Sequence, residues 1–151
     1  MRKSVFSYIE KKYKTSPEYP WAKDDRDAVF RHSGNRKWFA LVMEVGKEKL
    51  GLSGGGYVDA INLKIDDRMF HDILTREPGI FPAYHMNKEH WITVLLDGTV
   101  EEEKIFELID TSFQATAPKP SKLTSAPPKN ARTAASKSNE RTSEKSLEKK
   151  K

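Results

Sequence analysis

The spacing of apolar residues changes several times along residues 1–116, and each change predicts a new element. Val5, Ile9 and Tyr13 recur at every fourth position, which is typical of an amphipathic helix over about residues 2–14. A Thr-Ser-Pro sequence at residues 15–17 ends this pattern. From residue 27 onward, the segments AVFRH and KWFALVMEV flank a polar turn, and together they predict an antiparallel hairpin.

After a glycine-rich loop, residues 57–65 alternate between apolar and polar positions. Ile61, Leu63 and Ile65 share one face, and Asn62 and Lys64 share the other, as a half-buried strand requires.

The next segment has the spacing of a short helix. Asp66 is a candidate N-cap, and Pro-Gly at residues 78–79 ends the segment. One stripe carries Met69, Phe70, Ile73 and Leu74, and we expect this stripe to face the core.

The last part of the pattern predicts two strands and a helix. Residues 80–86 form a short extended piece in which Pro82 favours an edge position, and a corner at residues 87–88 leads into the strand HWITVLL. Thr99 and Glu102 have the spacing of a capping box for a final helix. The core face of that helix carries Ile105, Phe106, Leu108, Ile109 and Phe113.

The predicted order is α-β-β-β-α-β-β-α. Strands joined by hairpins form antiparallel sheets, and helices with a single apolar stripe cover one face most simply. We therefore expect a two-layer α+β fold with the helices on one face of the sheet and the other face partly exposed.

Composition divides the chain near residue 117. Residues 117–151 contain no aromatic residue and only two large aliphatic ones, Leu123 and Leu147, so we expect a disordered basic tail after a domain of residues 1–116. The tail holds 10 Lys and Arg against 3 Glu, a net charge of +7, whereas the domain holds 17 against 19 acids, a net of −2. The overall charge of +5 therefore comes from the tail. Such a tail can bind phosphates without reading sequence, or it can act only as a solubilising appendage.

Several kinds of chemistry have no support in the sequence. Cysteine is absent, which excludes disulfides and thiolate sites, and no apolar run reaches the ~20 residues that span a bilayer. His90, Asp110 and Ser112 are the residue types of a hydrolase triad, but no nucleophile-elbow pattern surrounds the serine. His85 and His90 lack a third metal ligand. We expect a cytoplasmic protein that is not an enzyme and has no metal or cofactor.

Two polar turns carry the remaining candidates for function. The first turn holds Arg31, His32, Asn35, Arg36 and Lys37, and the second holds His85, Asn87, Lys88 and His90. Arg and Lys side chains bind phosphates, and Asn or Arg can read base edges, so adjacent turns of this kind would suit a nucleic-acid groove. Solvated hairpin turns explain the same residues equally well. Trp38 and Trp91 are possible stacking residues, although packing in the core is the more common use of tryptophan.

Four blocks of the domain resemble the MmcQ/YjbR family: YPWAKDDRDAVFRHSGNRKWFAL, VDAINLK, PAYHMNKEHWITVLLDGTV and ELIDTSF. The resemblance implies a CyaY-like fold. It also implies a double-wing mode of DNA binding, in which the turns at residues 32–37 and 85–90 act as wings. The tail has no counterpart in the family pattern.

Two functions remain open at this point. The first is a non-enzymatic DNA-binding protein that uses the two turns. The alternative is a protein-interaction module that uses the open sheet face, to which Trp38 would contribute. A monomer is expected in either case.

Overall fold

The computed structural model describes residues 1–21 and 26–118. The predicted tail therefore lies outside the described residues apart from Ala117 and Pro118. The elements are α1 (Arg2–Tyr13), β1 (Ala28–Arg31), β2 (Trp38–Gly46), the 3₁₀ helix η1 (Lys47–Leu50), β3 (Tyr57–Lys64), α2 (Arg68–Leu74), β4 (Ile80–Pro82), β5 (Trp91–Leu95) and α3 (Glu102–Thr116). The predicted order and the α+β class are confirmed.

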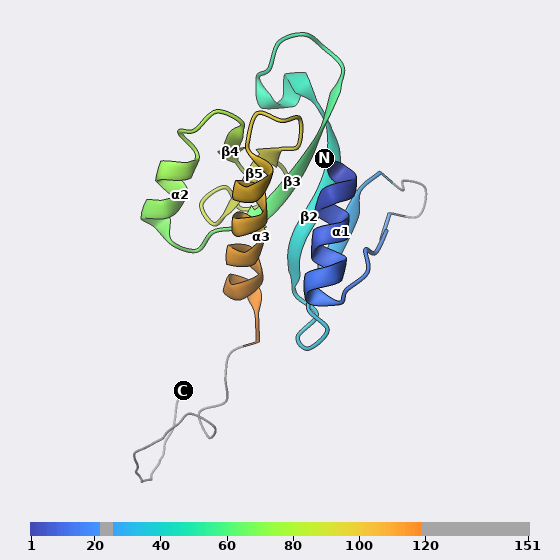
Figure 1. Cartoon of the computed structure of the whole chain (residues 1–151). Coiled ribbons are helices and arrows are strands. Elements are labelled where there is room, and N and C mark those ends of the chain that lie inside the picture. Colours follow the sequence, from blue (N-terminus) through green and yellow to red (C-terminus); the bar gives the residue numbers. More distant parts are fainter. Residues whose placement is uncertain (22–25, 119–151) are drawn as a thin grey trace. The chain divides into compact units, whose positions relative to one another are not determined.

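The strands form one antiparallel sheet in the order β1-β2-β3-β5-β4 (Figure 1). Both outer strands are poor templates for another chain. At one edge, Glu18 and Val29 exchange two backbone hydrogen bonds of 2.8 Å, which cover β1. At the other edge, β4 is three residues long and ends in Pro82, which has no N–H to donate.

Helices α1 and α3 lie side by side over one face of the sheet (Figure 1). Val5 and Ile9 of α1 and Ile105 and Ile109 of α3 are fully buried there against strand residues such as Ile61. The amphipathic patterns of these two helices are confirmed, because their apolar stripes face the sheet as predicted.

The second sheet face is closed, and the expectation of a partly exposed face was wrong. Leu41, Met43 and Val45 of β2 point to this face and are at most 6% exposed, as are Ala60 and Leu95 on the neighbouring strands. The loops cover them: the side chains packed against this cluster are Trp38, Leu50, Leu52, Phe81, Tyr84 and Met86. The central strands are thus apolar on both faces, and loops take the place of a second helix layer.

A buried polar network fixes the loop after β4 onto this second face. The Thr93 hydroxyl donates to Asn62 Oδ1 at 2.5 Å and accepts from the Tyr84 backbone N–H at 2.8 Å. Asn62 Nδ2 in turn donates to the Tyr84 carbonyl at 2.8 Å. Asn62 and Thr93 are fully buried partners across β3 and β5. Their polar groups are therefore satisfied by each other and by the loop backbone.

Helix α2 is rotated relative to the prediction. Met69, Phe70 and Ile73 are 73%, 37% and 52% exposed, whereas His71 and Leu74 are buried. The ring of His71 makes a 3.0 Å hydrogen bond to the Trp91 carbonyl through Nε2, and this contact fixes the rotation of the helix. Only Leu74 of the predicted stripe faces the core, because the seven-residue helix touches the sheet through one turn.

The helix caps also differ in detail from the sequence pattern. Asp67 rather than Asp66 caps α2, accepting a 3.1 Å hydrogen bond from the Phe70 N–H. Thr99 does not cap α3: the N-cap is Glu101, and the Glu102 carboxylate accepts a hydrogen bond from Ser4 of α1 instead. The predicted capping box is therefore replaced by a contact between two helices.

The polar network makes a testable contribution to stability. Thr93→Val should lower the free energy of unfolding by about 1–3 kcal/mol, because it leaves Asn62 Oδ1 and the Tyr84 N–H buried without partners. Urea unfolding measures the change. Thr111→Val is the matched control, because the Thr111 hydroxyl donates only to the exposed backbone carbonyl of Glu107 within α3. This change should alter the free energy of unfolding by no more than ~0.5 kcal/mol. Equal losses in the two variants would contradict the role assigned to Thr93.

Candidate nucleic-acid interface

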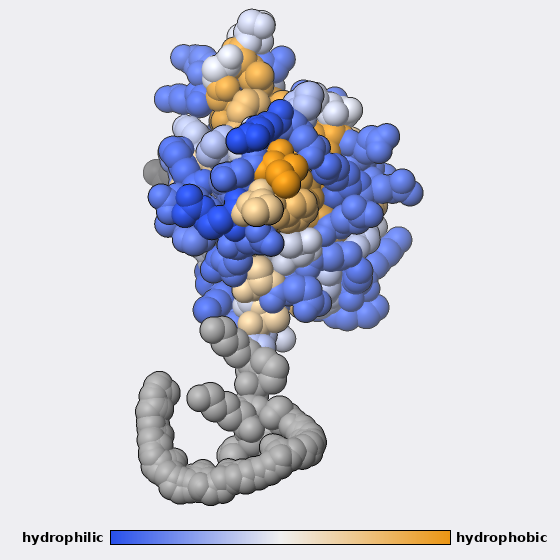
Figure 2. Space-filling model, turned by 90° about the vertical axis from the view of Figure 1, so that its left-hand side faces the viewer, coloured by the Kyte–Doolittle hydropathy of each residue, from blue (hydrophilic) through white to orange (hydrophobic). Residues whose placement is uncertain are grey.

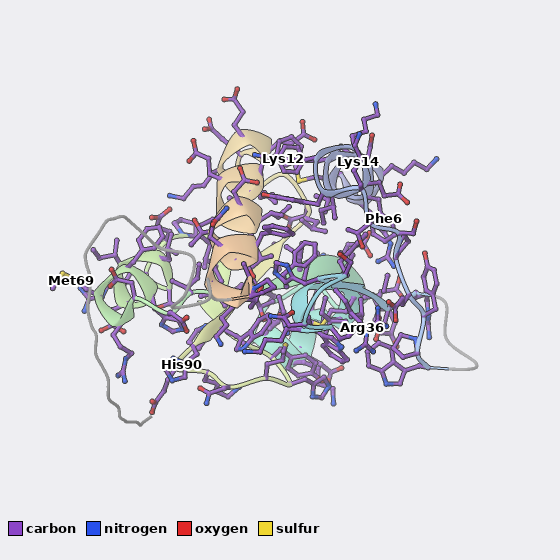
Figure 3. All side chains as sticks on the ribbon, turned by 90° about the horizontal axis from the view of Figure 1, so that it is seen from below. Phe6, Lys12, Lys14, Arg36, Met69 and His90 are labelled. Atoms are coloured by element: carbon purple, nitrogen blue, oxygen red, sulfur yellow. The ribbon has the colours of Figure 1, made fainter. Side chains whose placement is uncertain are left out.

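The sheet register brings the two predicted turns to the same end of the sheet. Arg31 pairs with Trp38 across the first turn, and Lys64, the last residue of β3, pairs with Trp91 at the start of β5. We call this end of the sheet the hairpin end; it is formed by residues 31–38, Lys64 and residues 87–91. Figure 3 shows Arg36 on the α1 side of this end and His90 on the α2 side.

The first turn is fastened to the C-terminal end of α3. His32 is only 5% exposed, and its Nε2 lies 2.8 Å from the Thr116 hydroxyl. Asn35 Nδ2 donates to the Thr116 carbonyl at 3.0 Å, and Asn35 Oδ1 accepts from the Lys37 N–H. Neither side chain is available to a ligand in this arrangement, since their polar groups already hold the turn in place.

The cations of the first turn differ in their freedom. Arg31 is partly buried and forms a 3.0 Å ion pair with Glu18, and its guanidinium lies 5.6 Å from the Trp38 ring centroid. Arg36 is exposed, with a 3.5 Å contact to the same Glu18. Lys37 is exposed, and its side chain forms no hydrogen bond or ion pair among the described residues. Arg36 and Lys37 are thus the accessible charges of this turn.

Trp38 and Trp91 are each partly buried. Trp38 packs on the second sheet face and meets Trp21 edge-on, with ring centroids 6.1 Å apart. The Trp91 backbone carbonyl accepts the hydrogen bond from His71. Packing accounts for much of the Trp38 side chain, and the predicted stacking roles of Trp38 and Trp91 stay predictions.

The second turn is shaped by its own polar groups. Asn87 Oδ1 accepts from the Glu89 N–H at 2.8 Å, while its carbonyl accepts from the His90 and Trp91 N–H groups. Lys88 Nζ donates to the Ala83 carbonyl at 2.8 Å, so its charge stays at the surface in a fixed place. His90 Nδ1 is buried and lies 4.0 Å from Asp66.

His85 is separated from the other residues of the second turn by its environment. It has a φ of 69°, and its ring lies against Tyr84 with centroids 3.8 Å apart. Both residues line a cavity of about 360 Å³ that also contains Asp27, Glu44 and Glu48. The lining carries these three carboxylates against one ammonium, that of Lys49, which disfavours a phosphate at this position. His85 thus lies apart from the cations of the hairpin end, and its predicted role in DNA binding stays a prediction.

Lys64 also lies at the hairpin end, although the sequence pattern predicts for it only a place on the polar face of a strand. Its ammonium lies 3.8 Å from Asp66, and the residue lies between the two turns in the sheet order. The strand register is what reveals it. The cations that the hairpin end offers to a ligand are therefore the exposed Arg36, Lys37 and Lys88 and the partly exposed Lys64.

The residues of the weak triad pattern do not meet as a triad. Asp110 accepts hydrogen bonds from Tyr8, Tyr13 and Lys12 of α1. Although burial alone would raise it, these hydrogen bonds hold the pKa of Asp110 below its usual value. Ser112 donates to the Phe39 carbonyl at 2.6 Å and accepts from the Lys64 N–H at 2.8 Å, joining α3 to β2 and β3.

Neither a metal site nor a membrane span emerges from the part of the chain that the structure describes. No group of three or more His, Asp and Glu side chains there is arranged to hold a metal ion. Among the same residues, none of the helices combines the length and apolarity needed to cross a bilayer.

Comparison with protein families and known proteins gives consistent matches. The model of the YjbR family matches residues 10–115. A relative named "Uncharacterized protein YyaQ" from Bacillus subtilis is 45% identical over 115 residues, which are 76% of this chain and 97% of the relative. "Uncharacterized protein YjbR" from Escherichia coli K12 is 34% identical over 76 residues, which cover 50% of this chain and 56% of the relative.

Solved structures show the same fold. A crystal structure of a protein from Pseudomonas syringae has a TM-score of 0.75 and 50% sequence identity, covering 78% of this chain and 99% of that one. The crystal structure of Deinococcus radiodurans protein DR2400 has a TM-score of 0.58 and 27% identity, covering 76% and 77% of the two chains.

The buried ring of His32 predicts a pH dependence of stability. Burial lowers the pKa of His32 below its ordinary value, against a smaller opposing effect of a backbone hydrogen bond with Phe113. The unfolded chain therefore binds the proton more tightly, and the free energy of unfolding should fall as the pH drops below about 6.5, by at most ~1.4 kcal/mol per pH unit. Urea unfolding between about pH 7.5 and 5.5 measures the slope.

The variant His32→Gln should reduce this slope, and His85→Gln, which alters an exposed histidine, is the matched control. An unchanged slope in His32→Gln would mean that other groups cause the acid destabilisation.

Proposed function

The chain belongs to the YjbR family, and from that premise we propose that its domain binds duplex DNA at the hairpin end without catalysing a reaction. The observation that supports this proposal is the presence of both turns at one end of the sheet, with Lys64 between them. The family resemblance implies two hairpin turns that act as wings, and the strand register supports this by bringing both turns to one end of the sheet.

The spacing of the two turns suits a nucleic-acid groove. In the order β1-β2-β3-β5-β4, the midpoint of the first turn and that of the second are three strand intervals apart. At ~4.8 Å per interval this distance is about 14 Å, comparable to the major-groove width of about 12 Å. Each turn can then reach the phosphates on one side of a groove.

Phosphate contacts would provide most of the affinity. Arg36, Lys37, Lys64 and Lys88 supply accessible positive charge, while Glu18, Asp66 and Glu89 reduce the net charge of the same end. The domain as a whole carries −2, so the expected binding is weak and strongly dependent on salt. The +7 charge of residues 117–151 would add nonspecific affinity.

Asn87 is the remaining amide candidate for reading a base edge. Asn35 is committed to Thr116, whereas the Nδ2 group of the exposed Asn87 has no partner among residues 1–21 and 26–118. An asparagine amide can bond adenine at two positions, although Asn87 Oδ1 already accepts from the Glu89 N–H. We therefore expect Asn87 to contribute little to any preference for one DNA sequence over another.

The structure disfavours the alternative function, a protein-interaction module that uses an open sheet face. The residues that would have formed that face are buried beneath loops in the described structure. A strand partner is also disfavoured, because Glu18 covers one edge of the sheet and Pro82 ends the other.

The proposal predicts the effect of removing charge from the hairpin end. Arg36→Gln combined with Lys37→Gln should weaken binding to a duplex of ~20 base pairs and reduce the slope of log K against log salt by about one unit per lost phosphate contact. Fluorescence anisotropy at several salt concentrations measures both quantities. Lys3→Gln combined with Lys49→Gln is the control, because it removes the same charge from two exposed residues elsewhere on the domain.

The measurement uses residues 1–117, so that the basic tail does not conceal the contribution of the domain. These residues form one compact unit, and the Bacillus relative is almost fully matched without a tail. Absence of binding at low salt, or equal losses in the two double variants, would contradict a specific role for the hairpin end.

A further inference from the structure

The exposed stripe of α2 has no structural use within the domain. Met69, Phe70 and Ile73 occupy positions i, i+1 and i+4 of the helix, so they share one side of it, and all three are exposed. Figure 2 shows the result as an apolar patch surrounded by hydrophilic side chains, and Figure 3 shows Met69 pointing outward from α2. Single exposed apolar residues are ordinary, but three neighbouring large ones mark a contact surface.

The helix cannot bury this stripe by turning in place. His71 and Leu74 hold the opposite side through the hydrogen bond to the Trp91 carbonyl and through packing in the core. The Asp67 cap fixes the first turn in addition. Burial of the stripe therefore requires another molecule.

We propose that a second copy of this chain covers the stripe, with the two α2 helices packed antiparallel about a two-fold axis. In such an isologous contact each residue meets its counterpart across the axis, so the surface must be complementary to itself. An axis at the level of position 71 places Met69 of one copy opposite Ile73 of the other, since each lies two positions from 71. It places the charges at the two ends of the stripe opposite each other as well.

The charges at the ends of the stripe have opposite signs. Asp66 precedes α2 and Arg76 follows it, five positions before and five positions after 71, so the antiparallel arrangement brings the Asp66 end of one copy to the Arg76 end of the other. Arg76 is exposed, and its side chain has no partner among the residues that the structure describes. Asp66 makes only long contacts, 3.8 Å to Lys64 and 4.0 Å to His90. The antiparallel pair would satisfy both charges, whereas a parallel pair would oppose like charges.

The size of the stripe determines the strength of the contact. Stable dimers bury about 800 Å² per partner, which is more than three side chains of a seven-residue helix can provide. The dimer should therefore be weak, with a Kd on the order of 0.1–1 mM at moderate salt.

Sedimentation of the full chain over a concentration series up to ~1 mM tests the proposal. We expect a concentration-dependent dimer, and Met69→Ser combined with Ile73→Ser should weaken its association about tenfold or more. Unfolding by urea should show that the variant remains folded, because both side chains are exposed. Tyr57→Ser is the control: Tyr57 is 69% exposed but lies on β3 outside the stripe, and its loss should leave association unchanged.

Charge reversal tests the antiparallel arrangement. Asp66→Arg and Arg76→Asp should each weaken the dimer, and the two changes together should restore it, because the opposed charges are exchanged. A chain that stays monomeric at ~1 mM overturns the proposal. So does a dimer that is unaffected by the serine variant, or a charge-reversed double variant that is no better than either single one.

Discussion

The architecture depends on one constraint: the central strands are apolar on both faces, but helices cover only one. β2 turns Ala40 and Val42 toward the helices and Leu41, Met43 and Val45 away from them. Leaving the second set in water would forfeit the free energy of their burial. The chain resolves this with loops, and the fully buried pair Asn62 and Thr93 holds the most important loop in place through the Tyr84 backbone. A loop carries backbone polar groups that a helix would satisfy internally, which is why two polar side chains lie in an otherwise apolar face.

The same solution positions the hairpin end. The segment that covers the second face begins at Ala83 and closes in the turn at Asn87, so the anchoring of Tyr84 also determines where Lys88 and His90 lie. The first turn is held differently, by Thr116 at the end of α3. Both turns are thus rigid through contacts with the core. Several polar residues that resemble ligand contacts in the sequence are spent on this rigidity, and four cations remain at the surface.

The two proposed surfaces arise from opposite circumstances. At the hairpin end, the sequence predicts polar side chains that bind a ligand, but some of them hold the turns in place instead. On α2, the sequence predicts buried apolar side chains, but three of them are exposed. Helix α2 follows β3 after three residues and is too short to lie across the sheet, so a single turn decides its rotation. In that turn, His71 gains a hydrogen bond at a backbone carbonyl, and Leu74 fills the core.

The sequence alone determined the order of elements, the antiparallel sheet, and the inward faces of α1 and α3, because apolar period is a local property that long stripes report reliably. It also identified both turns and the edge position of Pro82. Tertiary structure decided what the pattern could not. Whether Leu41 and Met43 are covered depends on loops that are distant in the sequence. The spacing of apolar residues in α2 also does not show which side of this short helix packs against the sheet. The availability of His32 and Asn35 was decided by Thr116, more than 80 residues away. Hydrogen bonds between such distant residues leave no periodic signal, so only the folded chain shows which polar groups stay free.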